Sequence, residues 1–175
     1  MISRTVFSHL KNTDLHCISA LEAIRDLLGV ELVGLKRLLF WEFKLSASSD
    51  QEADRCLQTV LNTTYYVINP NKESFSLEKL PRFPLLASAS CFLVQGYSKT
   101  ASHQAVLAEK IRRKCGVEIR ELRKSVLWLI GTDKNKDVTQ QELIDRVIVS
   151  RSREQGILIN PVYETFRFLT PADYL

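Results

Sequence analysis

The stretch Val67–Phe75 (VINPNKESF) recurs near the end of the chain as Leu158–Phe166 (LINPVYETF). Each copy has two apolar residues, an Asn-Pro pair, a Glu four residues after the Asn, and a Phe two residues after that Glu. Proline lacks a backbone N–H and disfavours helix at the preceding residue, so each copy predicts a turn that leads into a strand. The repetition indicates that the chain consists of two similar units.

A second pair of matching stretches lies upstream of these turns. Leu28–Leu32 (LGVEL) corresponds to Cys115–Ile119 (CGVEI), and Trp41 corresponds to Trp128. The two glycines are 87 residues apart and the two Asn-Pro pairs are 91 residues apart, so the second unit is longer in between. The polar loop 133–137 holds much of the extra length.

Hydrophobic periodicity predicts the order β-α-β-β-α-β in both units, which is the ferredoxin-like arrangement of an α+β protein. In the first unit we expect a strand at 5–10, a helix between an Asp14 cap and a Gly29 stop, a hairpin of strands 31–35 and 37–45, a helix from Ser49 or Asp50, and a strand at 73–77. In the second unit we expect strands at 91–95, 119–122 and 126–130, and helices at 107–115 and 143–148. The predicted domains are residues 1–78 and 90–175, joined by the linker 79–89.

Two segments depart from regular structure. The linker contains Pro81 and Pro84, which argue against regular structure, while its apolar residues predict that it packs onto the protein. In the second unit, Thr139 and Glu142 form a predicted capping box, but Arg151 and Ser152 stand where the first unit has Val60 and Leu61. We therefore expect an exposed loop at 150–155.

Composition is that of an ordinary soluble protein. Of the 175 residues, 45% are hydrophobic and 25% are charged, and no apolar run approaches the roughly 18 residues needed to span a bilayer. The N-terminus lacks the apolar stretch of a secretory signal, so we expect a cytoplasmic protein without membrane contact. The four cysteines are widely separated, which predicts free thiols and no zinc site.

The sequence lacks the common patterns that carry catalytic chemistry. The three histidines are not spaced like metal ligands, the six glycines are isolated, and no nucleophilic serine lies in a Gly-x-Ser-x-Gly turn. We therefore expect no catalytic residue, no cofactor and no metal.

The net charge of +4 is unevenly distributed, because residues 1–80 carry −1 and residues 81–175 carry +5. Part of the positive charge forms a cluster of seven residues: Lys110, Arg112, Arg113, Lys114, Arg120, Arg123 and Lys124. A ferredoxin-like sheet is also the scaffold of RNA-binding modules, yet the aromatic strand 39–43 lacks their basic-Gly-aromatic signature. A solvated helix face or contact with an acidic protein accounts for the cluster better than nucleic acid does.

These motifs resemble PurS, the small subunit of phosphoribosylformylglycinamidine synthase, a ligase of purine biosynthesis. The matching elements are Leu10-Lys11, Leu28–Val30, Leu61-Asn62 and Asn69–Phe75 in the first half, and Cys115–Val117 and Asn160–Phe166 in the second. The family is usually a single unit that dimerises, and it often carries Asp-Pro-Gln-Gly at the start of the first helix, which this chain lacks. The tandem form resembles the N-terminal region of the large single-chain enzyme, which mimics a PurS dimer.

The resemblance implies a component without catalysis of its own. It would bridge the glutaminase (PurQ-like) and synthetase (PurL-like) subunits or domains and support ammonia transfer between them. We hypothesise that two turns present the docking surface, namely Asn69, Pro70 and Glu73, and Asn160, Pro161 and Glu164; alternatively these residues only shape the turn. Trp41 and Trp128 either pack in the core or form the seam between the two units, where large aromatics contribute strongly.

Other functions remain open at this point. A tandem ACT-like module that senses amino acids has the same order of elements, and it needs a glycine turn after the first strand, for which Gly96 is a loose match. A pair of RNA-binding domains is a further alternative. Open sheet edges would also allow homo-association.

Overall fold

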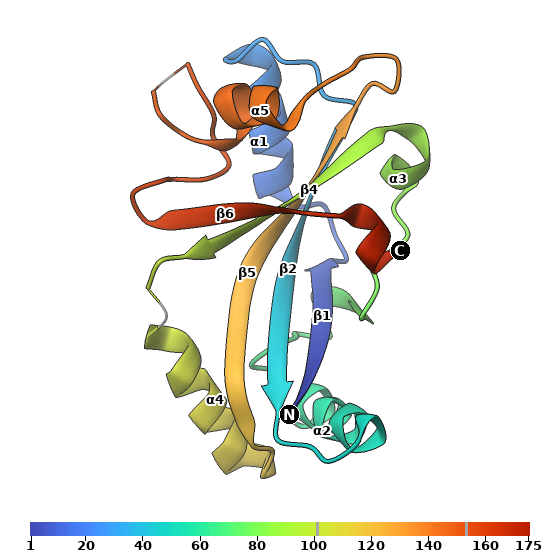
Figure 1. Ribbon diagram of the computed structural model, residues 1–175, viewed down its shortest axis with the longest axis vertical. Helices are drawn as coiled ribbons and strands as arrows, with labels where there is room; N and C mark the ends of the chain where they lie inside the picture. Colours follow the sequence, from blue (N-terminus) through green and yellow to red (C-terminus); the bar gives the residue numbers. More distant parts are fainter. Residues whose placement is uncertain (101, 153) are drawn as a thin grey trace. The chain divides into compact units, whose positions relative to one another are not determined.

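The computed structural model describes residues 1–100, 102–152 and 154–175 (Figure 1). The protein is α+β, and its described strands form one sheet in the order β3-β1-β2-β5-β4-β6. The strands are β1 (Ile2–Leu10), β2 (Gly34–Leu45), β3 (Glu73–Leu77), β4 (Ser90–Ser98), β5 (Ile119–Thr132) and β6 (Glu164–Leu169). The helices are α1 (Leu15–Asp26), α2 (Asp50–Thr63), α3 (Pro84–Ser88), α4 (Ser102–Cys115), α5 (Gln140–Leu143), the π-helix η1 (Ile144–Ile148) and the 3-10 helix η2 (Pro171–Tyr174).

The hairpin predicted within each half is wrong. The first half has the single strand β2 in its place, and the second half has the single strand β5 where two strands were expected. The segment that was to form the first turn contains no Asn-Gly or Pro-Gly pair to close it, so extended backbone continues through it. Buried side chains occur along the whole strand, from Leu35 near its start to Leu45 at its end.

The chain divides into two compact units, and each unit combines segments from both halves of the sequence. Unit 1 contains Met1–Asn12, Leu38–Pro81 and Thr100–Ser125, and unit 2 contains Thr13–Arg37, Arg82–Lys99 and Val126–Leu175. Both β2 and β5 therefore contribute one part to each unit. Within unit 1 the strand order is β3-β1-β2-β5, and within unit 2 it is β2-β5-β4-β6.

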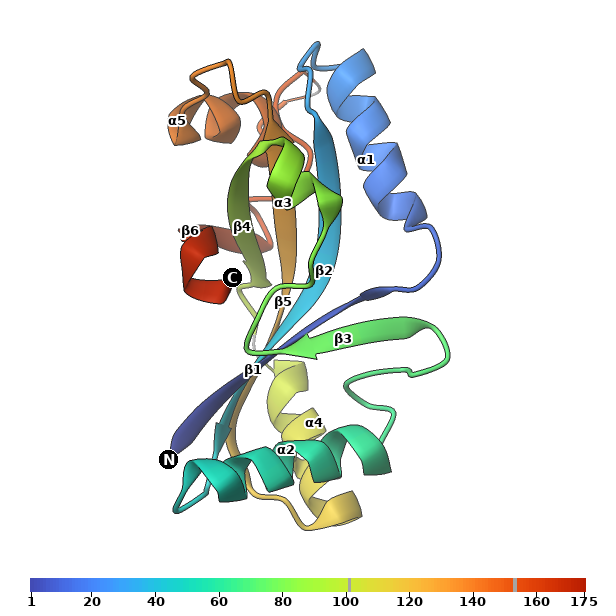
Figure 2. The ribbon, with the colours of Figure 1, turned by 90° about the vertical axis from the view of Figure 1, so that its right-hand side faces the viewer.

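Unit 1 contains two helices, α2 and α4, that contact each other and cross in the view of Figure 2. The amphipathic stripe of α2 buries Ala53, Leu57, Val60 and Leu61, as its helical spacing predicts. These side chains join Trp41 of β2 and residues of the second half in one hydrophobic cluster. Ser49 caps α2, because its hydroxyl accepts a hydrogen bond from the Glu52 N–H at 3.2 Å.

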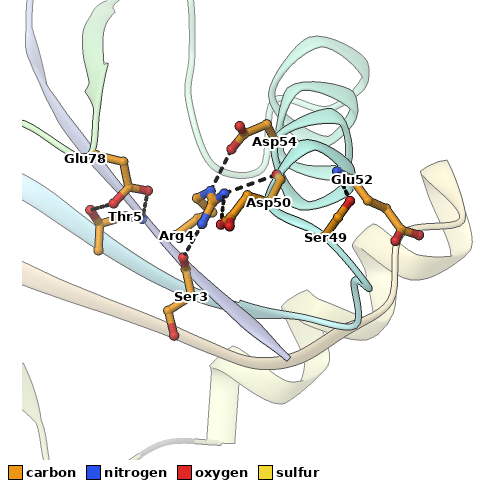
Figure 3. A network of polar contacts seen from close by, with 8 residues as sticks. All are labelled: Ser3, Arg4, Thr5, Ser49, Asp50, Glu52, Asp54 and Glu78. Carbon is orange, nitrogen blue, oxygen red and sulfur yellow. Dashed lines mark hydrogen bonds and ion pairs between the residues drawn. The ribbon is translucent and has the colours of Figure 1, made fainter.

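A polar network ties the start of β1 to the start of α2 (Figure 3). The Arg4 guanidinium donates to Asp54 at 2.6 Å and to Asp50 at 2.7 Å, and both carboxylates lie in the first turns of the helix. On the other side of the strand, the Glu78 carboxylate accepts hydrogen bonds from the Thr5 N–H at 2.9 Å and from its hydroxyl at 3.2 Å. Glu78 holds a left-handed backbone (φ 61°), which these two hydrogen bonds help to stabilise.

Unit 2 has a core of the same kind, which α1 shares with α5 and η1. Ile24 of α1 and Val147 of η1 are fully buried in one cluster with Trp128 of β5. Asp14 caps α1 as expected, since its carboxylate accepts from the N–H groups of His16 at 3.0 Å and Cys17 at 3.3 Å. Burial raises the pKa of the Cys17 thiol, and all four cysteines carry free thiols as predicted.

The two halves diverge at the second helix. In place of a helix like α2, the second half has one α-helical turn followed by η1, whose last hydrogen bond joins the Val149 N–H to the Ile144 carbonyl at 3.2 Å. Thr139 caps this segment, because its hydroxyl accepts from the Glu142 N–H at 3.1 Å. The described residues of the 150–155 loop are exposed, which confirms that prediction. After the loop, Gly156–Ile159 runs back along η1, and Ile157 donates to the Val147 carbonyl at 2.9 Å.

The linker is more ordered than its two prolines suggest. Pro84 occupies the first turn of α3, where a missing N–H leaves no hydrogen bond unmade, so here the proline begins a helix. The expectation of packing is confirmed, because Leu85 is buried and α3 lies against β4 (Figure 2). A Cβ atom on Gly131 would lie only 2.6 Å from the Leu85 Cδ1, and one on Gly34 only 2.9 Å from the same atom. Two glycines therefore make room for one leucine.

Gly96 lies inside β4, where its Cα pairs with Val126 on one side and Phe166 on the other. A Cβ at this position would meet the Ile159 Cδ1 at 2.4 Å, so the small residue admits a core side chain. It does not form the turn after the first strand that an ACT-like module requires. A membrane-spanning helix, which requires a long apolar run, is not found within residues 1–100, 102–152 and 154–175.

Candidate docking turns

The first Asn-Pro element folds as a turn in which Asn69 accepts three hydrogen bonds and donates one. Its side-chain Oδ1 accepts from the Asn71 N–H at 3.1 Å, and its carbonyl accepts from the N–H groups of Lys72 at 3.0 Å and Glu73 at 2.8 Å. In return, the Glu73 carboxylate accepts from the Asn69 N–H at 2.7 Å. Asparagine is favoured here because its short amide can imitate a backbone turn. Both side chains therefore stabilise the turn from within.

The second element has the same hydrogen bonds. The Asn160 Oδ1 accepts from the Val162 N–H at 3.0 Å, and its carbonyl accepts from Tyr163 at 3.1 Å and Glu164 at 2.8 Å. The Glu164 carboxylate accepts from the Asn160 N–H at 2.9 Å. The sequence repeat therefore corresponds to a repeat of local structure, in unit 1 and again in unit 2.

A lysine from the end of the first strand of each half completes the turn. The Lys11 Nζ donates to the Pro70 carbonyl at 2.6 Å, and the Lys99 Nζ donates to the Pro161 carbonyl at 2.5 Å. The backbone N–H groups of the same lysines donate to the carbonyls of Lys72 and Tyr163, both at 2.9 Å. The sequence did not reveal this role. The spacing of 88 residues between the lysines, close to the 87 between the paired glycines, is the signal that could have identified it.

The two turns differ in the side chains that they expose. The first presents Asn71 and Lys72, both polar and exposed. At the corresponding positions the second presents Val162 and Tyr163, each 68% exposed. Exposed tyrosine with an apolar neighbour is typical of protein–protein interfaces. The same turn structure therefore exposes polar side chains in unit 1 and apolar and aromatic side chains in unit 2.

Replacing Asn69 or Asn160 by Ala is expected to lower the free energy of unfolding by about 1 kcal/mol, because the turn loses the side-chain acceptor. Replacement by Asp retains an acceptor oxygen and is expected to have a much smaller effect. Urea unfolding of the four single variants measures the difference. Equal stability of the Ala and Asp variants would show that the amide does not hold the turn.

The two tryptophans lie in different cores. Trp41 is 2% exposed and packs in unit 1 with Ile111 and Leu122 of the second half. Trp128 is 8% exposed and packs in unit 2 with Ile24 and other residues of the first half. Each tryptophan therefore packs where side chains from both halves of the sequence meet.

Four of the seven residues of the basic cluster on α4 and β5 pair with carboxylates. Glu109 accepts from Arg112 at 2.8 Å and from Arg113 at 2.7 Å, and these hydrogen bonds lower the pKa of its carboxyl group to about 2. Glu118 pairs with Arg120 at 3.0 Å, and Glu121 pairs with Arg123. The Lys124 ammonium lies 5.0 Å from the centre of the Trp41 ring. Partners this close reduce the positive potential that a phosphate backbone would meet.

Among the described residues, no group of three or more His, Cys, Asp or Glu side chains is arranged to hold a metal ion. No protein-family model, curated protein or solved structure matches the chain.

Proposed function

We propose that this chain is a PurS-like bridging component of phosphoribosylformylglycinamidine synthase, without catalysis of its own, which holds glutaminase and synthetase parts together for ammonia transfer. The observation that carries the proposal is the pair of Asn-Pro turns. They have the same hydrogen bonds at corresponding places in the two halves, and they expose unlike side chains. A bridge between two unlike partners requires two unlike docking surfaces on related scaffolds.

The composition of the compact units supports a tandem pseudo-dimer. Within unit 1, the order β3-β1-β2-β5 with α2 and α4 is that of a ferredoxin-like unit whose second strand and first helix come from the other half of the chain. Unit 2 has the reciprocal composition, with α1 and the start of β2 supplied by the first half. We propose that each half opens its hairpin into one long strand and exchanges a helix and half a strand with the other half.

The exposed turn residues define two docking surfaces. The first, the polar turn surface, consists of Asn71 and Lys72, and the second, the apolar turn surface, consists of Val162 and Tyr163. Because tyrosine is a frequent hot-spot residue, Tyr163 is expected to contribute more binding energy than any residue of the polar turn surface. Each surface is proposed to meet one of the two partners.

The test is co-elution of the chain with the glutaminase and with the synthetase subunit on a sizing column, each partner offered separately. Tyr163→Ser is expected to abolish binding to one partner and to leave the other complex intact. Lys72→Glu is expected to abolish binding to the other partner and to leave intact the complex that Tyr163→Ser disrupts. Tyr65→Ser is a matched control, since Tyr65 is 75% exposed and lies outside both turns. Loss of neither complex in the folded variants would remove the docking role from the turns.

A further inference from the structure

Unit 2 contains a cavity of about 310 Å³ beneath the connection between α1 and β2. The apolar part of its lining, called the floor below, includes Leu32, Leu143 and Val147, which are all buried. Val138, in the loop before α5, also lines the cavity. A volume near the lower end of the roughly 300–1,000 Å³ range of ligand sites suits a metabolite of amino-acid size.

The second half departs from the repeat in two segments, and residues of both segments line this cavity. The extra length between β5 and α5 supplies Lys136 and Val138, and the π-helix η1 supplies Arg146 and Val147. π-Helical turns occur frequently at functional sites, because they redirect side chains that a regular helix would point elsewhere. The equivalent segment of the first half is a short loop followed by the regular helix α2. The departures from the repeat therefore coincide with the walls of a cavity.

Two weak ion pairs lie at the rim of the cavity, and each consists of one basic and one acidic side chain. The Lys136 Nζ lies 3.7 Å from the Glu31 carboxylate, and the Arg146 guanidinium lies 3.4 Å from the Glu142 carboxylate. All four side chains are substantially exposed, and pairs of this kind contribute little to stability, so a ligand can open them at low free-energy cost. An anionic ligand alone would lie close to two carboxylates, whereas a zwitterion gives both charges of one opened pair a new partner.

From the cavity and its rim, we propose that unit 2 binds an apolar α-amino acid. Its side chain occupies the floor formed by Leu32, Leu143 and Val147. Its carboxylate pairs with Arg146, and its ammonium group pairs with a rim glutamate. The inference rests on the geometry of unit 2 and is independent of the bridging function.

Calorimetric titration of the full chain with L-leucine tests the proposal, with two analogues that each lack one charge. 4-Methylpentanoate lacks the ammonium group and 3-methylbutylamine lacks the carboxylate. We expect saturable binding of leucine and at least roughly tenfold weaker binding of each analogue, because charge-assisted hydrogen bonds are the stronger ones. Absence of saturable leucine binding at millimolar concentration would overturn the proposal, and so would binding of either analogue as tightly as leucine.

Two variants locate the site. Val138→Phe fills the cavity and is expected to abolish leucine binding, and Arg146→Gln is expected to weaken the binding of leucine but not that of 3-methylbutylamine. Arg151→Gln is the matched control, because Arg151 pairs with Asp145 at 3.0 Å and does not line the cavity. Leucine binding that is unaltered in both site variants would place the ligand elsewhere and contradict the proposal.

Discussion

Gly156→Ala is expected to lower the free energy of unfolding by about 3–5 kcal/mol, the largest effect of any single methyl group considered in this chain. A Cβ at this position would lie 2.0 Å from the Val149 carbonyl oxygen and 2.7 Å from the Val149 nitrogen. Those atoms belong to backbone at the end of η1, so no side-chain rotation relieves the overlap. The left-handed backbone of Gly156 (φ 59°) adds roughly 1–2 kcal/mol for any residue with a Cβ.

The chain provides matched controls for this substitution. Gly29 (φ 60°) and Gly116 (φ 71°) have nearly the same backbone conformation, but nothing lies within 4 Å of a Cβ at either position. Gly29→Ala and Gly116→Ala are therefore expected to cost only the conformational part, about 1–2 kcal/mol. Urea unfolding of the three variants measures the difference. Equal losses at all three positions would mean that Val149 does not restrict Gly156.

Leu85→Ala is expected to destabilise the protein by about 2–5 kcal/mol, because it empties a closely fitted apolar site. The Leu85 side chain lies over two glycines of different strands, Gly34 of β2 and Gly131 of β5. This contact fixes the linker within unit 2. The loss of unfolding free energy in Leu85→Ala therefore measures how strongly the linker is attached.

A double-mutant cycle separates this fit from a general loss of apolar contacts. Gly131→Ala places a Cβ 2.6 Å from the Leu85 Cδ1 and is expected to cost about 1–3 kcal/mol in the wild-type background. In the Leu85→Ala background the overlap with Leu85 is gone and only the 3.1 Å approach to the Ala89 Cβ remains, so the loss of stability is expected to be much smaller. Thermal or urea unfolding of the four proteins gives the coupling energy. Additive losses of unfolding free energy in the double variant would contradict the close packing of Leu85 on Gly131.

Local features of the fold follow closely from the sequence. Asp14, Ser49 and Thr139 cap helices at the positions that their side chains predict, because capping depends only on neighbours along the chain. The Asn-Pro repeat likewise predicts two turns, and the hydrogen bonds within them are the same in both copies. Local chemistry determines these features, and local chemistry can be read from a single sequence.

The long strands could not be predicted in the same way. The sequence between residues 31 and 45 is compatible with a hairpin and with a continuous strand, and the difference depends on which distant strand pairs with each end. For the same reason the sequence does not reveal that α2 packs beside α4. The cavity of unit 2 could not be predicted because its lining residues come from two segments that are at least 100 residues apart in sequence, 29–32 and 132–147.

The central claim is that the chain bridges two partners and carries out no chemistry of its own. It is tested most directly by amidine formation with the glutaminase and synthetase subunits from the same source, measured with glutamine and, in parallel, with ammonium chloride. A bridge is required only when ammonia must pass between subunits. We therefore predict that glutamine-dependent activity needs the chain and that ammonium-dependent activity does not. Glutamine-dependent activity that is indifferent to the chain would contradict the account, and so would a requirement for the chain with ammonium.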